Sequence, residues 1–178
     1  MIKIIFVNFI TLLRGASVFL LPYLLSTHYL IALFWVAGFA LTDMLDGYLA
    51  RKWKAETLFG TIFDPFADKL FYIGNLASLA TILPQLSEIV LQTIPPECAL
   101  MLIRMPWFAR KIGATTPATY LGKIKMAGQS MSLIYILLGL FLRRPDIIAT
   151  GAIFAWCSVF LSLLSLTSHF WDEKKQPA

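Results

Sequence analysis

The sequence predicts an all-α integral membrane protein with six transmembrane helices and both termini in the cytoplasm. Hydrophobic residues make up 58% of the chain, and the mean hydropathy is +0.74, whereas apolar residues account for roughly 45–50% of a soluble domain. They occur in long blocks without Asp, Glu, Lys or Arg, at 15–41, 70–87, 126–142 and 147–171. A helix needs about 20 apolar residues to cross a bilayer. Because charged residues are only 14% of the chain, a soluble helical bundle would lack polar surface.

The first two helices are expected at 5–26 and 28–52. The N-terminal segment has the length of a span, and Arg14 interrupts it before any small-residue cleavage site, so we expect an uncleaved span and not a signal peptide. The polar residues Ser26-Thr27-His28 separate the two helices, and a charged run from Arg51 to Glu56 ends the second.

The remaining helices are expected at 59–83, 86–109, 119–142 and 146–171, so that residues 1–178 form a single transmembrane domain. Pro84 ends the third helix, and a break from Gly113 to Pro117 precedes the fifth. Pro95-Pro96 is expected to distort the fourth helix because proline lacks a backbone donor. Asp146 is predicted to cap the sixth helix. Cys98 and Cys157 are far apart in apolar segments, and we expect both to be buried.

The distribution of basic residues orients the predicted spans. Basic loops stay in the cytoplasm, and most of the 15 basic residues fall on one predicted face, namely Lys3, Arg51, Lys52, Lys54, Arg104, Arg110, Lys111, Lys123, Lys125, Lys174 and Lys175. Only Arg143 and Arg144 fall on the opposite face. The net charge of +5 therefore follows from topology. It suits contact with anionic lipid headgroups, and no nucleic-acid partner is expected.

Four aspartates lie at the cytoplasmic ends of the second and third predicted helices: Asp43, Asp46, Asp64 and Asp68. Spacings of three and four residues place each pair on one helix face. Ionisable groups at a membrane are costly and mark functional sites. With no His or Cys nearby, these carboxylates favour Mg²⁺, Mn²⁺ or Ca²⁺ over zinc. Two ions held this way would suit in-line displacement at phosphorus.

Small residues and a cation accompany the aspartates: Gly47, Ala50, Arg51 and Gly60. Small residues allow a backbone or planar group to approach closely, and an arginine can bind phosphate oxygens with two nitrogens. Taken singly, the small residues would more often serve helix packing, and Arg51 would be an ordinary cytoplasmic charge. Together with four carboxylates in fixed register they argue against these ordinary roles and indicate a site suited to phosphate groups.

The motif Asp-x2-Asp-Gly-x2-Ala-Arg-x8-Gly-x3-Asp-x3-Asp, which runs from Asp43 to Asp68, resembles the signature of the CDP-alcohol phosphotransferase family. The resemblance implies six transmembrane helices, a homodimer, and two divalent cations, Mg²⁺ or Mn²⁺. It also implies transfer of a phosphatidyl or similar group from a CDP-linked donor to an alcohol, with release of CMP. The protein would be a multi-pass protein of the cell inner membrane with its site on the cytoplasmic side.

The same resemblance assigns roles to the motif residues. It makes Asp43, Asp46 and Asp64 metal ligands, and Asp68 the general base, which also touches the metal. The CDP site would be lined by Gly47, Ala50, Arg51 and Gly60. A carboxylate beside Mg²⁺ is a weak base, but a metal-polarised hydroxyl needs little basicity.

The rest of the chain is most similar to the phosphatidylglycerophosphate synthases of this family, which use CDP-diacylglycerol and sn-glycerol 3-phosphate. The similarity rests on Asn8-x2-Thr11-x2-Arg14 and on Gly122-Lys123-Ile124-Lys125 with Gln129. A phosphorylated acceptor needs cations, and a basic rim near the aspartates supplies them: Arg104, Arg110, Lys111, Lys123 and Lys125. We expect Arg104 and Lys123 to contact the acceptor phosphate, with Asn8, Thr11 and Arg14 lining the acceptor site.

One departure leaves the acceptor open. The group usually carries Arg-Glu in the fourth span, whereas Pro96 precedes Glu97 here. The same chemistry with another acceptor is therefore an alternative: a cardiolipin synthase that uses phosphatidylglycerol, or a phosphatidylserine synthase. More remote alternatives are a non-catalytic family member and a cation transporter built on the aspartates.

Overall fold

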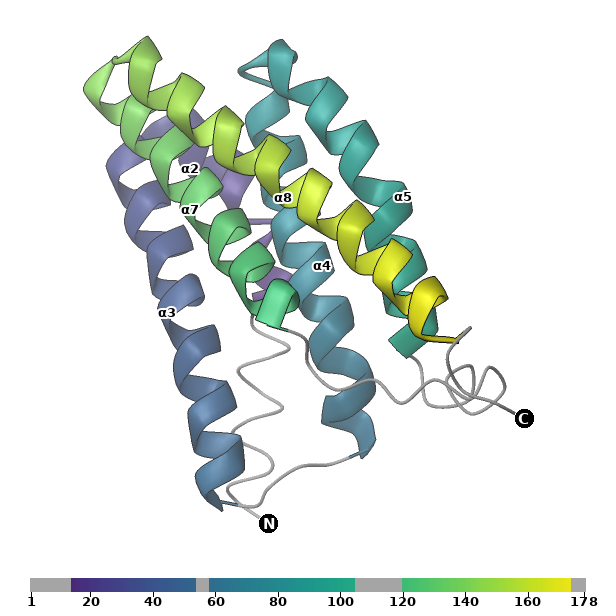
Figure 1. Ribbon diagram of the computed structural model, residues 1–178. Helices are drawn as coiled ribbons and strands as arrows, with labels where there is room; N and C mark the ends of the chain where they lie inside the picture. Colours follow the sequence, from purple (N-terminus) through teal and green to yellow (C-terminus); the bar gives the residue numbers. More distant parts are fainter. Residues whose placement is uncertain (1–13, 54–57, 105–119, 174–178) are drawn as a thin grey trace.

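The computed structural model describes residues 14–53, 58–104 and 120–173, and for 43–53, 58–65, 104, 120–121 and 168–173 it describes the backbone alone. The described residues contain helices and no strand (Figure 1), as the all-α prediction requires. The elements are α2 (Leu21–Thr27), α3 (Tyr29–Trp53), α4 (Leu58–Ala80), η1 (Pro84–Leu86), α5 (Ser87–Arg104), α7 (Tyr120–Leu142) and α8 (Pro145–Glu173).

The first predicted span differs from the structure. Residues 14–17 form a helical turn, residues 18–20 form a turn, and α2 begins only at Leu21. The cause is Pro22, which lies in the first turn of α2. Proline has no N–H to donate to the carbonyl of Val18, and its ring would clash with that carbonyl in a continuous helix. The prediction of one unbroken helix is therefore wrong over 14–26, and residues 1–13 lie outside the described residues.

The two prolines of the fourth predicted span do not interrupt it. Helix α5 runs from Ser87 to Arg104 with Pro95 and Pro96 inside it. Each proline removes only the donor that would reach the carbonyl four residues earlier, at Leu91 and Gln92. The distortion expected from the sequence therefore does not end the helix.

Successive long helices run in alternating directions (Figure 1). The connections from α4 through η1 to α5 and from α7 to α8 lie at one end of the molecule. Helix α7 packs extensively on α8, and two glycines permit this close approach. A Cβ at Gly139 would lie 2.8 Å from the backbone nitrogen of Ile148, and one at Gly151 would lie 2.8 Å from that of Ile136.

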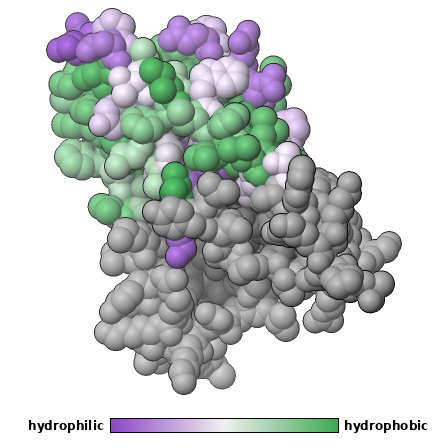
Figure 2. Space-filling model, viewed as in Figure 1, coloured by the Kyte–Doolittle hydropathy of each residue, from purple (hydrophilic) through white to green (hydrophobic). Residues whose placement is uncertain are grey.

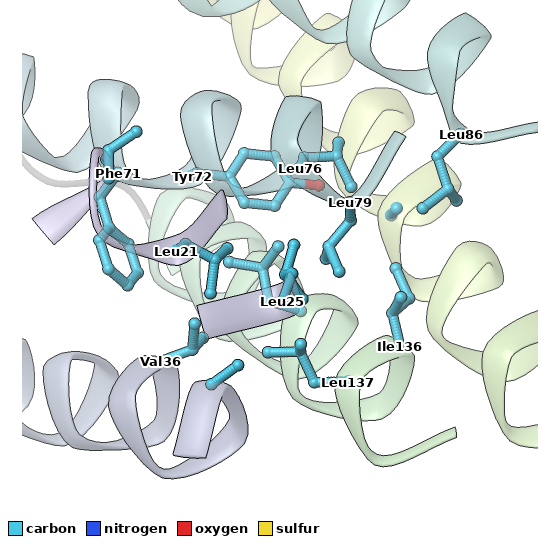
Figure 3. Close-up of a cluster of buried hydrophobic side chains, with 14 of the residues drawn as sticks. Leu21, Leu25, Val36, Phe71, Tyr72, Leu76, Leu79, Leu86, Ile136 and Leu137 are labelled. Atoms are coloured by element: carbon cyan, nitrogen blue, oxygen red, sulfur yellow. The ribbon is translucent and has the colours of Figure 1, made fainter. Parts of the chain in front are cut away.

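A buried apolar cluster joins all the described helices, α2, α3, α4, η1, α5, α7 and α8, and Figure 3 shows part of it. The fully or almost fully buried side chains of Leu21, Leu76 and Ile136 lie at its centre. Figure 3 also shows Val36, Leu79 and Leu137 facing this cluster. The short helix α2 thus fills the space between longer helices, and its packing holds the backbone that follows Arg14 in position.

The outer surface is strongly apolar. Phe34 of α3, Leu91 of α5 and Ile153 of α8 are all more than 60% exposed. In Figure 2 hydrophilic residues gather at the end where α7 turns into α8, and the surface below them is mainly hydrophobic. Cys98 and Cys157 are also exposed, so the expectation that both are buried is wrong. Both cysteines lie on faces of α5 and α8 that no other described helix covers.

Three of the described helices are long and apolar enough to cross a membrane: Pro84–Ile103, Gly122–Leu142 and Pro145–Thr167. A shorter apolar helical stretch covers Tyr29–Thr42. These helices fit a membrane protein. Six spans and the position of the termini stay predictions.

The turn between α7 and α8 corrects one predicted cap. Arg143 has φ 55°, and the N–H groups of Arg143 and Arg144 donate to the carbonyls of Leu140 and Gly139, a pattern common at helix C-termini. Helix α8 begins at Pro145, so Asp146 lies inside its first turn. The Asp146 carboxylate accepts two hydrogen bonds from the Arg144 guanidinium, at 2.9 and 2.7 Å, so the prediction that it caps the helix is wrong.

Candidate active site

Asp68 forms a partly buried ion pair with Arg14. The carboxylate lies on α4 with 21% of its side chain exposed, and the Arg14 guanidinium reaches it from the helical turn before α2. The Ser17 hydroxyl donates to the Arg14 carbonyl at 2.6 Å, which closes that turn. The break at Pro22 therefore matters for the site, because it places residues 14–17 beside α4.

The Asp68–Arg14 pair lines a small hollow of about 40 Å³ between α3, α4 and α7. Its other walls are mostly apolar, with Gln129 and Ser130 as polar residues of α7. The full lining is Arg14, Phe39, Ala40, Asp68, Phe71, Tyr72, Met126, Gln129, Ser130 and Leu133. A hollow of this kind can admit a small polar group and hold it against a carboxylate.

The backbone supports the predicted spacing of the other aspartates. Asp43 and Asp46 lie in the continuous helix α3, and Asp64 lies one turn before Asp68 in α4. Their side chains lie outside the described part of the structure, so the convergence of four carboxylates stays a prediction. Within the described residues no three His, Cys, Asp or Glu side chains come together, and Asp68 is the only one of the four that this statement covers.

The predicted nucleotide residues are placed by backbone alone. Gly47, Ala50 and Arg51 follow Asp46 along α3, and Gly60 precedes Asp64 by one turn in α4. Each is therefore in a helix that carries aspartates, as the motif requires. Their contacts lie outside the described residues.

The predicted acceptor residues divide into three groups. Arg14 lines the hollow, as expected of a site residue. Lys123 is exposed near the start of α7, and Arg104 is the last residue of α5. Asn8 and Thr11 lie outside the described residues, as do Arg110 and Lys111 of the predicted basic rim. Lys125, also assigned to that rim, is instead buried.

Glu97 forms the centre of a buried polar cluster that the sequence did not predict. Its side chain on α5 has no exposed surface. It pairs with Lys69 of α4, and both its oxygens lie close to Lys125 Nζ of α7, at 3.0 and 3.1 Å. Gln129 Nε2 and Ser162 Oγ donate to Oε1 at 2.7 and 2.8 Å. One carboxylate thus joins α4, α5, α7 and α8.

The cluster meets the hollow at Gln129. Lys69 follows Asp68 in the chain, and Gln129 belongs both to the cluster and to the hollow. A sequence signal existed: Glu97 is an acid inside an apolar segment, and such a group needs a buried cationic partner. Lys69 and Lys125 are basic residues at the edge of or within apolar segments, but nothing in their spacing says that they meet Glu97.

The comparison with known proteins identifies the family. A family model described as CDP-alcohol phosphatidyltransferase matches residues 4–164. The chain belongs to the CDP-alcohol phosphatidyltransferase family. The matched range includes residues 43–68, which carry the aspartate motif.

Several curated relatives in this family carry one name, CDP-diacylglycerol–glycerol-3-phosphate 3-phosphatidyltransferase. The protein of that name from Rickettsia felis is 33% identical over 145 residues, which cover 76% of this chain and 75% of the relative. The one from Rickettsia bellii is 31% identical and covers 94% of both chains. A third, from Haemophilus influenzae, is 42% identical over 77 residues, 38% of this chain and 39% of its own.

Proposed function

We propose that this protein transfers the phosphatidyl group of CDP-diacylglycerol to sn-glycerol 3-phosphate, giving phosphatidylglycerophosphate and CMP. The observation that carries the proposal is the similarity, over 94% of both chains, to a relative named for this reaction. The complete aspartate motif supports it, because a relative that had lost the chemistry would have no reason to keep all eight positions.

In the proposed reaction an acceptor hydroxyl oxygen attacks the phosphorus of the phosphatidyl group. The bond from that phosphorus to the CMP oxygen breaks, and CMP leaves. Asp68 takes the proton of the attacking hydroxyl, for which it must lie within hydrogen-bond reach. Its position at the hollow supports this role.

The aspartates suit divalent cations. Asp43, Asp46, Asp64 and Asp68 would hold two ions, Mg²⁺ or Mn²⁺, because hard carboxylate oxygens are the ligands these ions prefer. The Asp68 carboxylate, partly exposed in the hollow and already paired with a cation, has the charge and access that such a ligand needs. When bound, the ions would neutralise charge on the phosphates and polarise the attacking hydroxyl.

Substrate contacts are assigned by the motif and the charges. Gly47, Ala50, Arg51 and Gly60 would line the CDP moiety. Arg104 and Lys123 would bind the acceptor phosphate, and Asn8, Thr11 and Arg14 would complete the acceptor site. The site would face the cytoplasm of an inner-membrane homodimer with six spans per chain, which suits a lipid donor and a water-soluble acceptor meeting at the membrane surface.

A second candidate uses the same chemistry with phosphatidylglycerol as acceptor, as a cardiolipin synthase does. Two observations favour it. Pro96 stands where an arginine is expected, and both lysines nearest Glu97 are engaged by that carboxylate. Fewer cations are then left to bind an acceptor phosphate, and a reaction with phosphatidylglycerol as acceptor needs fewer cations than one with glycerol 3-phosphate.

The direct test of the reaction is CMP release from CDP-diacylglycerol by the purified protein in detergent. We expect CMP only when glycerol 3-phosphate and Mg²⁺ or Mn²⁺ are both present, and none after chelation of the cations. Release without an acceptor would indicate hydrolysis, and no release with any alcohol would indicate a non-catalytic member.

A further inference from the structure

Among the side chains that the structure describes, Gln129 alone belongs both to the Glu97 cluster and to the hollow beside Asp68. It lies on α7 and is almost completely buried. Its Nε2 donates to Glu97 Oε1 at 2.7 Å, and its side chain lines the hollow together with Arg14 and Asp68. Because Glu97 holds the Gln129 amide in place, the cluster can determine how this amide contacts a molecule that enters the hollow.

The orientation of the Gln129 amide is fixed by chemistry. Glu97 contacts two lysines, so it is ionised and can only accept hydrogen bonds. The amide nitrogen must therefore face Glu97, and the amide oxygen must face the other way. Nothing in the described part of the chain donates a hydrogen bond to this oxygen. It is the polar atom that Gln129 leaves available at the hollow.

The hollow offers acceptors for hydroxyl protons. Asp68 of α4, which carries a carboxylate, and Gln129 of α7, which carries an amide oxygen, both line it beside the donor Arg14, and most other lining side chains are apolar. A volume of about 40 Å³ exceeds the roughly 10–15 Å³ that one water-sized group needs. Two neighbouring hydroxyl groups on a short carbon chain would match two acceptors in so small a space. Ser130 also lines the hollow, but its hydroxyl can rotate towards its own helix backbone and has no fixed direction.

We propose that Gln129 is a specificity residue, whose amide oxygen accepts a hydrogen bond from the acceptor's second hydroxyl, next to the hydroxyl that loses its proton to Asp68. This rests on the proposed function, in which glycerol 3-phosphate carries two adjacent hydroxyl groups. Glu97 is then a positioning residue, since it acts through the amide that it holds. An acceptor without the second hydroxyl would leave the Gln129 oxygen without a hydrogen bond. The cost of that unpaired oxygen is what lets a polar site reject an analogue.

The test compares glycerol 3-phosphate with 3-hydroxypropyl phosphate, which keeps the reacting hydroxyl and the phosphate but lacks the second hydroxyl. We expect the wild type to prefer glycerol 3-phosphate in kcat/KM by about tenfold or more, the worth of one hydrogen bond. Gln129→Met keeps the volume and removes the amide, so the preference should fall to about one. Ser162→Ala is the matched control, because Ser162 also donates to Glu97 Oε1 but does not line the hollow. It should keep the wild-type preference.

Four outcomes would overturn the proposal. If Gln129→Met lowers kcat/KM equally for both acceptors, Gln129 supports the fold and does not bind the second hydroxyl of the acceptor. If Ser162→Ala loses the preference to the same extent, the effect belongs to the cluster as a whole. If the wild type uses both phosphates equally well, the proposed reaction stands and the role of Gln129 is wrong. If the wild type uses neither, the proposed function fails first and the assignment of Gln129 fails with it.

Discussion

Asp68 is the residue on which the proposed chemistry depends. It alone among the four aspartates has a described side chain, and it meets Arg14 at the hollow. The sequence could predict this carboxylate because its register with Asp64 and the small residues is a local property of one helix. It placed Arg14 near the site only by resemblance, since the contact spans 54 residues and depends on the turn that Pro22 creates.

We expect Asp68→Asn to lower kcat by at least about 100-fold while binding of CDP-diacylglycerol persists, because a general base contributes roughly 10²–10⁴-fold. Asp146→Asn is the control, an exposed carboxylate at the α7–α8 turn, and it should keep wild-type turnover. Turnover and donor binding are measured on the same purified samples. A normal kcat in Asp68→Asn would rule out Asp68 as the general base.

Glu97 shows what sequence reasoning could not supply. The acid was visible inside an apolar segment, but its partners come from three other helices. Such contacts follow from how helices pack and not from periodicity within one of them. Because of the same packing, Lys125 is buried against Glu97 and is not part of the basic rim that the sequence predicted.

Glu97→Gln should destabilise the protein by about 3–5 kcal/mol, because two buried lysines lose their counter-charge. Glu88→Gln changes the same residue type at the exposed start of the same helix and should shift stability by less than about 0.5 kcal/mol. Thermal unfolding in one detergent compares the two variants. Equal midpoints for both would mean that the cluster does not contribute to stability.

At the level of elements, helix ends marked by local chemistry were predictable. The ends of α3, α4 and α7 lie within a few residues of their expected positions because charges, prolines and polar turns mark them. The first span was not predicted correctly, since an apolar run conceals a break that Pro22 alone imposes. The turn between α7 and α8 lies where the sequence predicts it, but the left-handed conformation of Arg143 was not predicted, because it leaves no signal in the sequence.

The antiparallel pair α7–α8 depends on glycines at its interface. Gly151→Ala would bring a Cβ to 2.8 Å from the Ile136 backbone nitrogen, and backbone cannot move aside as a side chain can. We expect a loss of about 1–3 kcal/mol, typical of overpacking. Gly38→Ala is the matched control, since no described atom lies within 4 Å of its added Cβ, and alanine should stabilise α3 by about 0.5–1 kcal/mol. Both variants are compared by thermal unfolding, and a neutral Gly151→Ala would contradict the close approach.

At the level of the whole molecule, the distribution of charge predicts the orientation in the membrane. Lys123 and Arg144 are exposed at opposite ends of α7. In a background where Cys98 and Cys157 are replaced by serine, Lys123→Cys should react with an impermeant thiol reagent only from the cytoplasmic side, and Arg144→Cys only from the other side. Labelling of both from one side would contradict a membrane-spanning α7.

The fold class follows from composition alone, and the family follows from a motif confined to two helices. The acceptor does not follow from either, because in the proposed function it is selected by side chains that several helices bring together. Lys125, predicted to belong to a basic rim, instead contacts Glu97, and Gln129 links Glu97 to the hollow. In the proposed function, acceptor specificity therefore depends on contacts between helices, whereas the phosphotransfer chemistry depends on the aspartate motif.

The most direct measurement offers purified protein CDP-diacylglycerol together with glycerol 3-phosphate, phosphatidylglycerol, serine and inositol phosphate in one competition, and identifies the products by mass. We expect phosphatidylglycerophosphate as the main product. Cardiolipin, or any other phospholipid formed while glycerol 3-phosphate is left unused, would contradict the proposed acceptor.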